Sequence, residues 1–190
     1  MYLGQQINMT HNHMDEVKRR TRAGWCAFGK LNDIMRSKMP TCLKRKVFNQ
    51  CVLPAMTYGA ETWSLTKRME QKLITAQHSM ERCMLGFTKR DRKTVAWVRS
   101  QTEVTDIIHT IKMKKWHWAG HLARSTDNRW TKNVTEWRPW LGSRHQGRQK
   151  VRWRDEIASF IGIRWMATAN DRKLWCQLGE AFALQWAEYG

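Results

Sequence analysis

The amino-acid sequence predicts a mainly α-helical protein. Apolar residues recur every three or four positions over most of its 190 residues, as one face of a helix requires. Almost no segment alternates apolar and polar residues, as a half-buried strand does. Proline, glycine and threonine residues fall between the periodic runs, where helices end and begin. The length corresponds to about one domain or two small ones.

Three helices are predicted in the N-terminal half, over residues 14–39, 41–53 and 66–85. Pro40 separates the first two, and Pro54 ends or kinks the second because proline lacks a backbone N–H. We expect these helices to form a bundle in which side chains of the first meet side chains of the other two. The expected contacts join Trp25, Phe28 and Leu31 to Val47, Cys51 and Leu73.

The remaining elements are predicted from the same periodicity. A short aromatic and apolar segment at residues 2–7 suits a strand or hairpin. Helical segments are predicted over 95–99, from about 105 to 122, at 130–137, over 150–161 and from 171 onward. The helix from about 105 to 122 carries Ile107, Ile108, Ile111, Lys115, Trp118 and Leu122.

The net charge is the strongest indication of a partner. The chain has 34 Lys and Arg residues against 16 Asp and Glu, a formal net charge of +18. Such an excess concentrates polyanions, and counterion release makes phosphate binding its natural use. Nucleic acid is therefore the expected partner. An anionic membrane surface is the weaker alternative, because no long helix has one basic and one apolar face, and no segment has the length to span a membrane.

The five cysteines are Cys26, Cys42, Cys51, Cys83 and Cys176. Their number is odd, and the sequence contains no C-x-x-C pair of the kind that binds zinc or undergoes redox exchange. We therefore expect reduced, mostly buried thiols in an intracellular protein.

Two basic segments are the predicted nucleic-acid contacts. The first is the connector with Lys89, Arg90, Arg92 and Lys93, which only Asp91 opposes. The second spans residues 138–154 without an acidic residue, and its basic residues are Arg138, Arg144, Arg148, Lys150, Arg152 and Arg154. Arginine forks match phosphate oxygens in bidentate geometry.

Two tryptophans interleave with the arginines of the second segment. Trp140 and Trp153 have rings that can stack on bases. The alternative is a solvated loop beside a core tryptophan. That alternative fits Trp153, which shares a predicted helix face with Ile157 and Phe160, better than it fits Trp140.

No motif predicts catalysis or a metal site. The sequence lacks a P-loop, a G-x-G-x-x-G pattern and a G-x-S-x-G nucleophile elbow. The adjacent acidic pairs, at residues 15–16 and 155–156, are predicted to form salt bridges with neighbouring bases. His117 and His121 share a helix face, but Trp118 stands where a zinc protease has glutamate, so helix packing is the favoured interpretation.

Several strings of the sequence resemble a known family. They include Tyr2-Leu3-Gly4-Gln5, Arg19-Arg20-Thr21-Arg22-Ala23-Gly24-Trp25, Ala27-Phe28-Gly29-Lys30-Leu31, Leu53-Pro54-Ala55-Met56-Thr57-Tyr58-Gly59-Ala60-Glu61-Thr62-Trp63, Trp116-His117-Trp118-Ala119-Gly120-His121-Leu122-Ala123-Arg124, Asp127-Asn128-Arg129-Trp130-Thr131, Gly147-Arg148-Gln149-Lys150-Val151-Arg152-Trp153-Arg154-Asp155 and Asp171-Arg172-Lys173-Leu174-Trp175. In content and order they resemble the region after the palm in the RNA-directed DNA polymerases (reverse transcriptases) of non-LTR, LINE-type (RTE-like) retrotransposons.

The resemblance implies three parts. Residues 1–10 resemble a primer-grip strand, with Tyr2, Leu3 and Gly4 in the grip. Residues 11–88 resemble the helical thumb, which tracks an RNA or DNA template–primer duplex. Residues 89–190 resemble a basic, Trp-rich helical C-terminal region that binds nucleic acid. The implied location is intracellular and nuclear.

The sequence departs from the family at its catalytic site. The family's Ala-Asp-Asp motif precedes Tyr-Leu-Gly, and no Asp-Asp occurs in this chain. We therefore expect a C-terminal fragment without catalytic residues, metal or cofactor of its own, although the full-length family enzyme uses Mg²⁺. Purified protein is expected not to extend a primer, because two-metal catalysis needs clustered carboxylates. The alternative is a host protein derived from such a fragment, used as a nucleic-acid- or protein-binding module.

Overall fold

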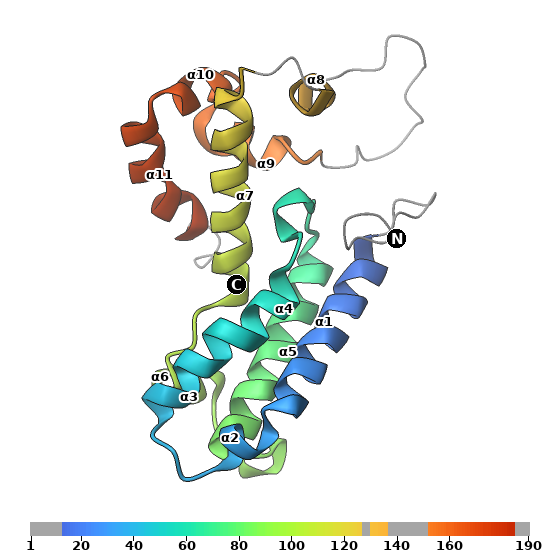
Figure 1. Ribbon diagram of the computed structural model, residues 1–190, viewed down its shortest axis with the longest axis vertical. Coiled ribbons are helices and arrows are strands. Elements are labelled where there is room, and N and C mark those ends of the chain that lie inside the picture. Colours follow the sequence, from blue (N-terminus) through green and yellow to red (C-terminus); the bar gives the residue numbers. More distant parts are fainter. Residues whose placement is uncertain (1–12, 127–129, 137–151, 185–190) are drawn as a thin grey trace. The chain divides into compact units, whose positions relative to one another are not determined.

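The computed structural model describes residues 13–126, 130–136 and 152–184 (Figure 1). Within these ranges every regular element is a helix, which confirms the mainly α prediction. The strand predicted at residues 2–7 lies outside the described residues. In the described part, no helix combines the length and the apolar character that crossing a membrane requires.

The chain divides into two compact units. Unit 1 comprises residues 1–60 and 65–111, and unit 2 comprises residues 61–64 and 112–190. The helices of unit 1 are α1 (His13–Lys30), α2 (Asn32–Arg36), α3 (Thr41–Val47), the π-helical turn η1 (Phe48–Val52), α4 (Leu53–Thr57), α5 (Lys67–Leu85), the 3₁₀ turn η3 (Lys89–Asp91) and α6 (Val95–Thr102). Helix α7 (Ile107–Arg124) begins in unit 1 and continues into unit 2, which also contains α8 (Trp130–Glu136), α9 (Asp155–Ile161), α10 (Trp165–Asn170) and α11 (Arg172–Leu184). The short turn η2 (Ala60–Thr62) lies where the chain passes between the units.

In unit 1, α1, α4 and α5 lie side by side around an apolar core (Figure 1). The close approach of α1 and α4 depends on Gly24, because a Cβ at this position would lie 2.3 Å from Cγ of Met56. Buried side chains from several helices fill the space between them, among them Val17, Phe28, Met35, Phe48, Val52, Met56, Leu73, Met80 and Met84.

The predicted contacts of the first helix are only partly correct. Phe28 and Leu73 are buried, as expected, and the Phe28 ring lies 6.5 Å from that of Phe48 in an edge-on arrangement. Trp25, however, is 37% exposed and Cys51 faces solvent. For Cys51 the reason is the phase of the second helix, whose inward face carries Lys44, Phe48 and Val52, one residue later than predicted. The shift already exists in α3, where Lys44 is buried and Leu43 is exposed, and the Lys44 ammonium donates to the Met84 carbonyl oxygen at 3.3 Å.

Helix α5 matches its prediction closely. It begins after Thr66 and ends at Gly86, whose φ of 77° lies in the left-handed region that favours glycine. Its buried Gln77 fixes the start of α7, because the side-chain amide donates to the Thr105 carbonyl oxygen at 2.8 Å and its oxygen accepts from Ile107 N at 2.8 Å. These two bonds satisfy backbone groups at a helix end.

A buried carboxyl lies between α5 and α6. Glu81 is fully buried, and its Oε2 accepts a hydrogen bond from Thr102 Oγ1 at 3.1 Å. Burial raises the pKa of Glu81 above its ordinary value, and this outweighs the opposing effects of Arg99 and Thr102. The folded state therefore holds the Glu81 proton more tightly than the unfolded chain does.

This pKa shift predicts a pH dependence of stability. As pH rises above the ordinary Glu pKa of about 4.3, the unfolded chain releases the proton first, so the free energy of unfolding falls until the raised folded pKa is passed. Glu81→Gln removes this slope. Urea unfolding between about pH 4 and 8 should therefore show the variant gaining stability relative to the natural protein as pH rises. A difference in the free energy of unfolding between the two proteins that stays constant across this pH range would contradict the raised pKa of Glu81.

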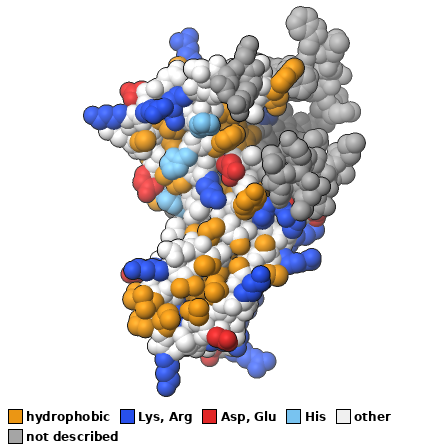
Figure 2. Space-filling model, viewed as in Figure 1, with side chains coloured by type: hydrophobic (Ala, Val, Ile, Leu, Met, Phe, Trp, Pro, Cys, Tyr) orange, Lys and Arg blue, Asp and Glu red, His pale blue; other side chains and the backbone are white. Residues whose placement is uncertain are grey.

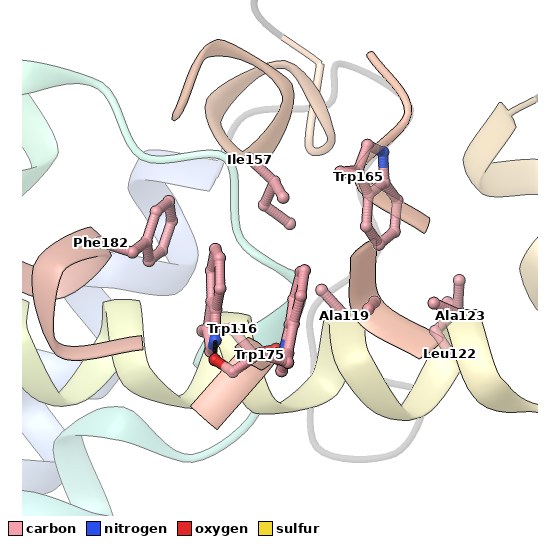
Figure 3. Packing of buried hydrophobic residues seen from close by; sticks show 9 residues of the cluster. Trp116, Ala119, Leu122, Ala123, Ile157, Trp165, Trp175 and Phe182 are labelled. Atoms are coloured by element: carbon pink, nitrogen blue, oxygen red, sulfur yellow. Dashed lines mark hydrogen bonds between the residues drawn. The ribbon is translucent and has the colours of Figure 1, made fainter. Parts of the chain in front are cut away.

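The core of unit 2 is built on two stacked tryptophans (Figure 3). The rings of Trp116 on α7 and Trp175 on α11 lie 3.8 Å apart and nearly parallel, at 11°. Each indole N–H donates to the other residue's backbone carbonyl oxygen, at 2.9 and 3.1 Å, so the buried N–H groups are satisfied reciprocally. Phe182 and Trp165 lie against this pair, 4.8 Å from Trp116 and 6.3 Å from Trp175 between ring centres.

Two glycines leave the space that these rings occupy. A Cβ at Gly120 on α7 would lie 2.5 Å from Nε1 of Trp175. A Cβ at Gly179 on α11 would lie 3.1 Å from Cδ1 of Trp116. The facing rings therefore require very small side chains on both helices.

Gly120→Ala is expected to destabilise the protein by about 1–3 kcal/mol, because the added methyl group forces the Trp175 ring out of its position. Gly29→Ala is the matched control, since it lies inside α1 and a Cβ there meets no atom within 4 Å. It should stabilise by about 0.5–1 kcal/mol through helix propensity alone. Denaturant unfolding of both variants measures the contrast, and equal effects would mean that the rings do not approach Gly120 this closely.

Unit 2 also contains a buried charge cluster. The ammonium groups of Lys112 and Lys115 on α7, each 2% exposed, both contact the carboxylate of Glu156 on α9. Lys115 Nζ also lies 3.5 Å from the Trp63 carbonyl oxygen. One carboxylate therefore forms salt bridges with two buried ammonium groups, and these salt bridges connect α7 to α9.

Two further sequence predictions are corrected, and one helix was missed. Helix α9 begins at Asp155 and not near residue 150, because residues 152–154 form a turn whose Arg152 N–H is bound by the Asp155 carboxylate at 2.7 Å. Helix α10 was not predicted. The cysteines are not mostly buried: Cys83 is half-buried and the other four are exposed, because large neighbours such as Phe48 and Trp175 determine which helix faces turn inward.

Candidate nucleic-acid interface

A short basic turn in unit 1 exposes four cationic side chains. Lys89, Arg90, Arg92 and Lys93 lie in and directly after η3, and all four are exposed. The only acid among them, Asp91, accepts hydrogen bonds from the backbone N–H and the hydroxyl of Thr88, at 2.6 and 2.8 Å. These bonds hold the Asp91 pKa below its ordinary value. The turn therefore uses its carboxylate internally and presents its four cations to solvent.

The conformation of this basic turn is defined by local contacts. Arg92 has a φ of 51°, in the left-handed region, and ends the 3₁₀ turn. The Lys93 ammonium lies 5.0 Å from the ring centre of Trp97 and 5.8 Å from that of Phe87. The two rings meet edge to face at 5.3 Å. An aromatic pair thus anchors one end of the turn through cation–π contacts.

Unit 1 has a second basic feature on α1 and α5. A groove of about 540 Å³ is lined by side chains of both helices, including Thr21, Arg68, Lys72, Thr75 and Ser79. The Thr75 and Ser79 hydroxyls donate to carbonyl oxygens one turn earlier on α5, whereas the buried Thr21 Oγ1 has no hydrogen-bond partner. Cations and hydroxyls in one groove are the side chains that contact phosphate.

Unit 2 contains an aromatic pocket of about 530 Å³, hereafter the tryptophan pocket. Its walls include Trp118 of α7, Trp130 of α8, and Trp153 with Arg152 and Arg154 from the turn before α9. Trp118 is 37% exposed and Trp130 is 80% exposed. No Asp or Glu lines the pocket among the described residues. The site is thus apolar, aromatic and cationic.

One wall of the tryptophan pocket is rigidly held. The Trp153 indole N–H donates to the Glu61 carbonyl oxygen at 2.7 Å, and its ring meets Trp165 edge to face at 6.5 Å. The Lys115 ammonium lies 5.4 Å from the Trp153 ring centre. Trp153 therefore both packs on the core of unit 2, as the sequence favoured, and lines a pocket.

The structure describes only part of the predicted site. The basic connector is exposed, and Arg152 and Arg154 line the tryptophan pocket. Eight predicted site residues lie outside the described residues: Tyr2, Leu3, Gly4, Arg138, Trp140, Arg144, Arg148 and Lys150. Trp118 and Trp130 were not predicted as site residues. The signal that could have identified Trp130 is the apolar repeat at residues 130 and 134, which lies on the exposed helix α8.

The predicted salt bridges are confirmed for residues 15–16, where Asp15 pairs with Lys18 and Glu16 pairs with Arg19 and Arg20. The prediction for residues 155–156 is wrong about the partners, because Glu156 contacts two lysines of α7 and Asp155 accepts from the Arg152 backbone N–H. His117 and His121 are both exposed on α7, and no group of metal-ligating side chains gathers in the described residues. Lys and Arg side chains outnumber Asp and Glu on the visible face (Figure 2).

Comparison with known proteins gives one relevant relative. The chain is 37% identical over 188 residues to an uncharacterised transposon-derived protein of Caenorhabditis elegans. The match covers 92% of this chain and 67% of the relative. No family model matches the chain. No solved structure matches it.

Proposed function

Because this chain belongs to the family of transposon-derived proteins that its relative in Caenorhabditis elegans represents, we propose that it binds nucleic acid through phosphate contacts. The observation that carries the proposal is the basic turn of unit 1. Four exposed cations lie within five residues, and the intervening carboxylate is bound by the turn itself. Exposed lysine and arginine clusters of this kind neutralise phosphates and release counterions.

The charge of the whole chain supports the same function. A net charge of +18 destabilises a compact protein by self-repulsion, and a polyanionic partner relieves that repulsion. The groove with Arg68 and Lys72 on α5 provides further phosphate contacts within the same unit. Phosphate contacts carry no sequence information, so binding through them is expected to depend little on sequence.

The more specific part of the proposal concerns origin. We propose that the chain derives from the region after the palm of a non-LTR retrotransposon reverse transcriptase, and that residues 11–88, most of which lie in unit 1, correspond to a thumb that holds template–primer. The sequence strings that resemble this region, the helical fold and the transposon-derived relative all support the assignment. In this role the protein positions a duplex and performs no chemistry itself.

A variant with all four cations of the basic turn replaced by alanine, K89A/R90A/R92A/K93A, tests the function. If each cation contacts a phosphate, the slope of log K against log[salt] should become less negative by up to about 3.6, at roughly 0.9 per contact. The loss of affinity should be similar for duplexes of unrelated sequence, because phosphates are common to all of them. Fluorescence anisotropy with labelled duplexes measures both quantities.

The matched control removes the same charge elsewhere. Arg22 on α1, Arg164 before α10, and Arg172 and Lys173 at the start of α11 are also exposed and lie outside the basic turn. Their replacement by alanine should change the salt slope much less than the variant of the basic turn. Equal changes in both variants would show that net charge alone attracts nucleic acid, and that the basic turn is not a binding site.

A further inference from the structure

The tryptophan pocket of unit 2 has a composition that a structural role does not explain. Trp130 is 80% exposed, although a helix of a folded unit normally turns such a ring inward. Trp118 and Trp153 line the same pocket from different elements. Large aromatic rings from three segments that converge on one concave surface indicate a binding site for a flat, apolar group.

The charge of the pocket specifies the ligand further. Arg152 and Arg154 line it, and the nearest acids in sequence are engaged: Asp155 accepts from the Arg152 backbone N–H, and Glu156 contacts Lys112 and Lys115. A ligand that combines a flat ring with negative charge therefore matches the walls. A nucleotide has this combination, because its base stacks on indole rings and its phosphate pairs with guanidinium.

The shape of the pocket favours one unpaired base. Its volume of about 530 Å³ lies in the range of small-molecule sites, whereas a duplex presents its bases stacked and paired inside. A second hollow of about 310 Å³ shares Trp118, Leu122 and Thr131 with the pocket and also contains Arg124. The two hollows thus adjoin at Trp118 and provide a second cationic position next to the first.

We propose that the tryptophan pocket binds an unpaired base of a single-stranded nucleic acid by stacking on Trp118 and Trp130, with Arg152 at the adjoining phosphate. This inference rests on the proposed function, which it extends from phosphate contact in unit 1 to base contact in unit 2. It makes the protein a binder of strands with unpaired nucleotides in addition to duplexes.

The test uses the full chain and two labelled single strands of about ten nucleotides, within the usual site size of such proteins. One is oligodeoxythymidine, and the other has the same backbone and charge but abasic sugars. Anisotropy should show the base-containing strand bound about 5- to 150-fold more tightly, the equivalent of roughly 1–3 kcal/mol for one stacked base. Its binding should also quench tryptophan fluorescence.

Three variants assign this preference to the pocket. Trp118→Ala and Trp130→Ala should each reduce the preference for the base-containing strand and leave the affinity for the abasic strand unchanged. Trp25→Ala is the matched control, because Trp25 on α1 is 37% exposed, as Trp118 is, and does not line the pocket. It should retain the full preference. Trp130 is largely exposed, so its replacement should not impair folding. The test therefore stays valid even if Trp118→Ala impairs folding.

The possible failures are distinguishable. Equal affinity for the two strands would overturn the base-binding inference and leave phosphate binding intact. A preference that survives in both pocket variants would place base contact elsewhere and would also overturn it. Absence of binding to both strands and to duplex would overturn the proposed function itself.

Discussion

Replacement of Trp116 by alanine is expected to lower the free energy of unfolding by about 3–5 kcal/mol. The ring is completely buried, stacks on Trp175 at 3.8 Å and contacts Phe182. Its removal leaves a cavity at the centre of unit 2. It also leaves the Trp175 carbonyl oxygen without the indole N–H that donates to it.

Trp118→Ala provides the control on the same helix. Trp118 lies two residues away and is 37% exposed, so its loss should cost about 1 kcal/mol or less. Urea unfolding followed by circular dichroism measures both variants. Similar losses for the two substitutions would contradict the assignment of Trp116, and not Trp118, to the core.

Glu156→Gln is expected to be nearly as severe, at about 3–5 kcal/mol, because it removes the carboxylate that two buried ammonium groups contact. Lys112 and Lys115 are each 2% exposed, so water cannot replace the lost negative charge. The same unfolding measurement gives the magnitude.

A second substitution separates charge from packing in this cluster. Adding Lys112→Met to Glu156→Gln removes one buried charge and keeps most of the side-chain volume, so the double variant should regain part of the lost stability. If Lys112→Met instead lowers the stability of the Glu156→Gln variant by as much as it lowers the stability of the natural protein, the two side chains are not coupled. In that case the cluster does not act through charge.

The sequence predicts long, periodic helices well when strong end signals bound them. Helix α5 shows this most clearly, because Thr66 and Gly86 define its ends and apolar residues at helical spacing define its buried face. The end of α9 was predicted for the same reason, because Gly162, with a φ of 96°, ends it as expected, whereas the start of α9 was not. Local chemistry determines these features.

Tertiary packing determines what the sequence did not reveal. The inward face of the second helix carries Lys44, Phe48 and Val52, one residue later than the apolar pattern indicates, because the buried Lys44 ammonium donates to the Met84 carbonyl oxygen, a partner that only the fold supplies. On α7, Trp116 and Trp118 are about 200° apart around the helix axis. The choice between them depends on Trp175, Gly120 and Gly179, which reach this position only in the fold.

One part of the candidate site could be predicted from the sequence and the other could not. The basic turn at residues 89–93 was predictable, because charge and local turn chemistry lie within one short segment. The tryptophan pocket was not, because Trp118, Trp130 and Trp153 come from three segments of the chain that share no local pattern.

Whether this protein binds nucleic acid through its basic surface is decided by the salt dependence of duplex binding by the unmodified chain. Anisotropy with two duplexes of unrelated sequence, between about 50 and 200 mM salt, should give log K falling linearly with log[salt]. A slope of about −3 to −4, or steeper where the groove of α1 and α5 adds contacts, and equal for the two duplexes, is the result expected if the four cations of the basic turn contact phosphates. A flat dependence, or no binding at the lowest salt concentration, would contradict the claim that this protein binds nucleic acid through its basic surface.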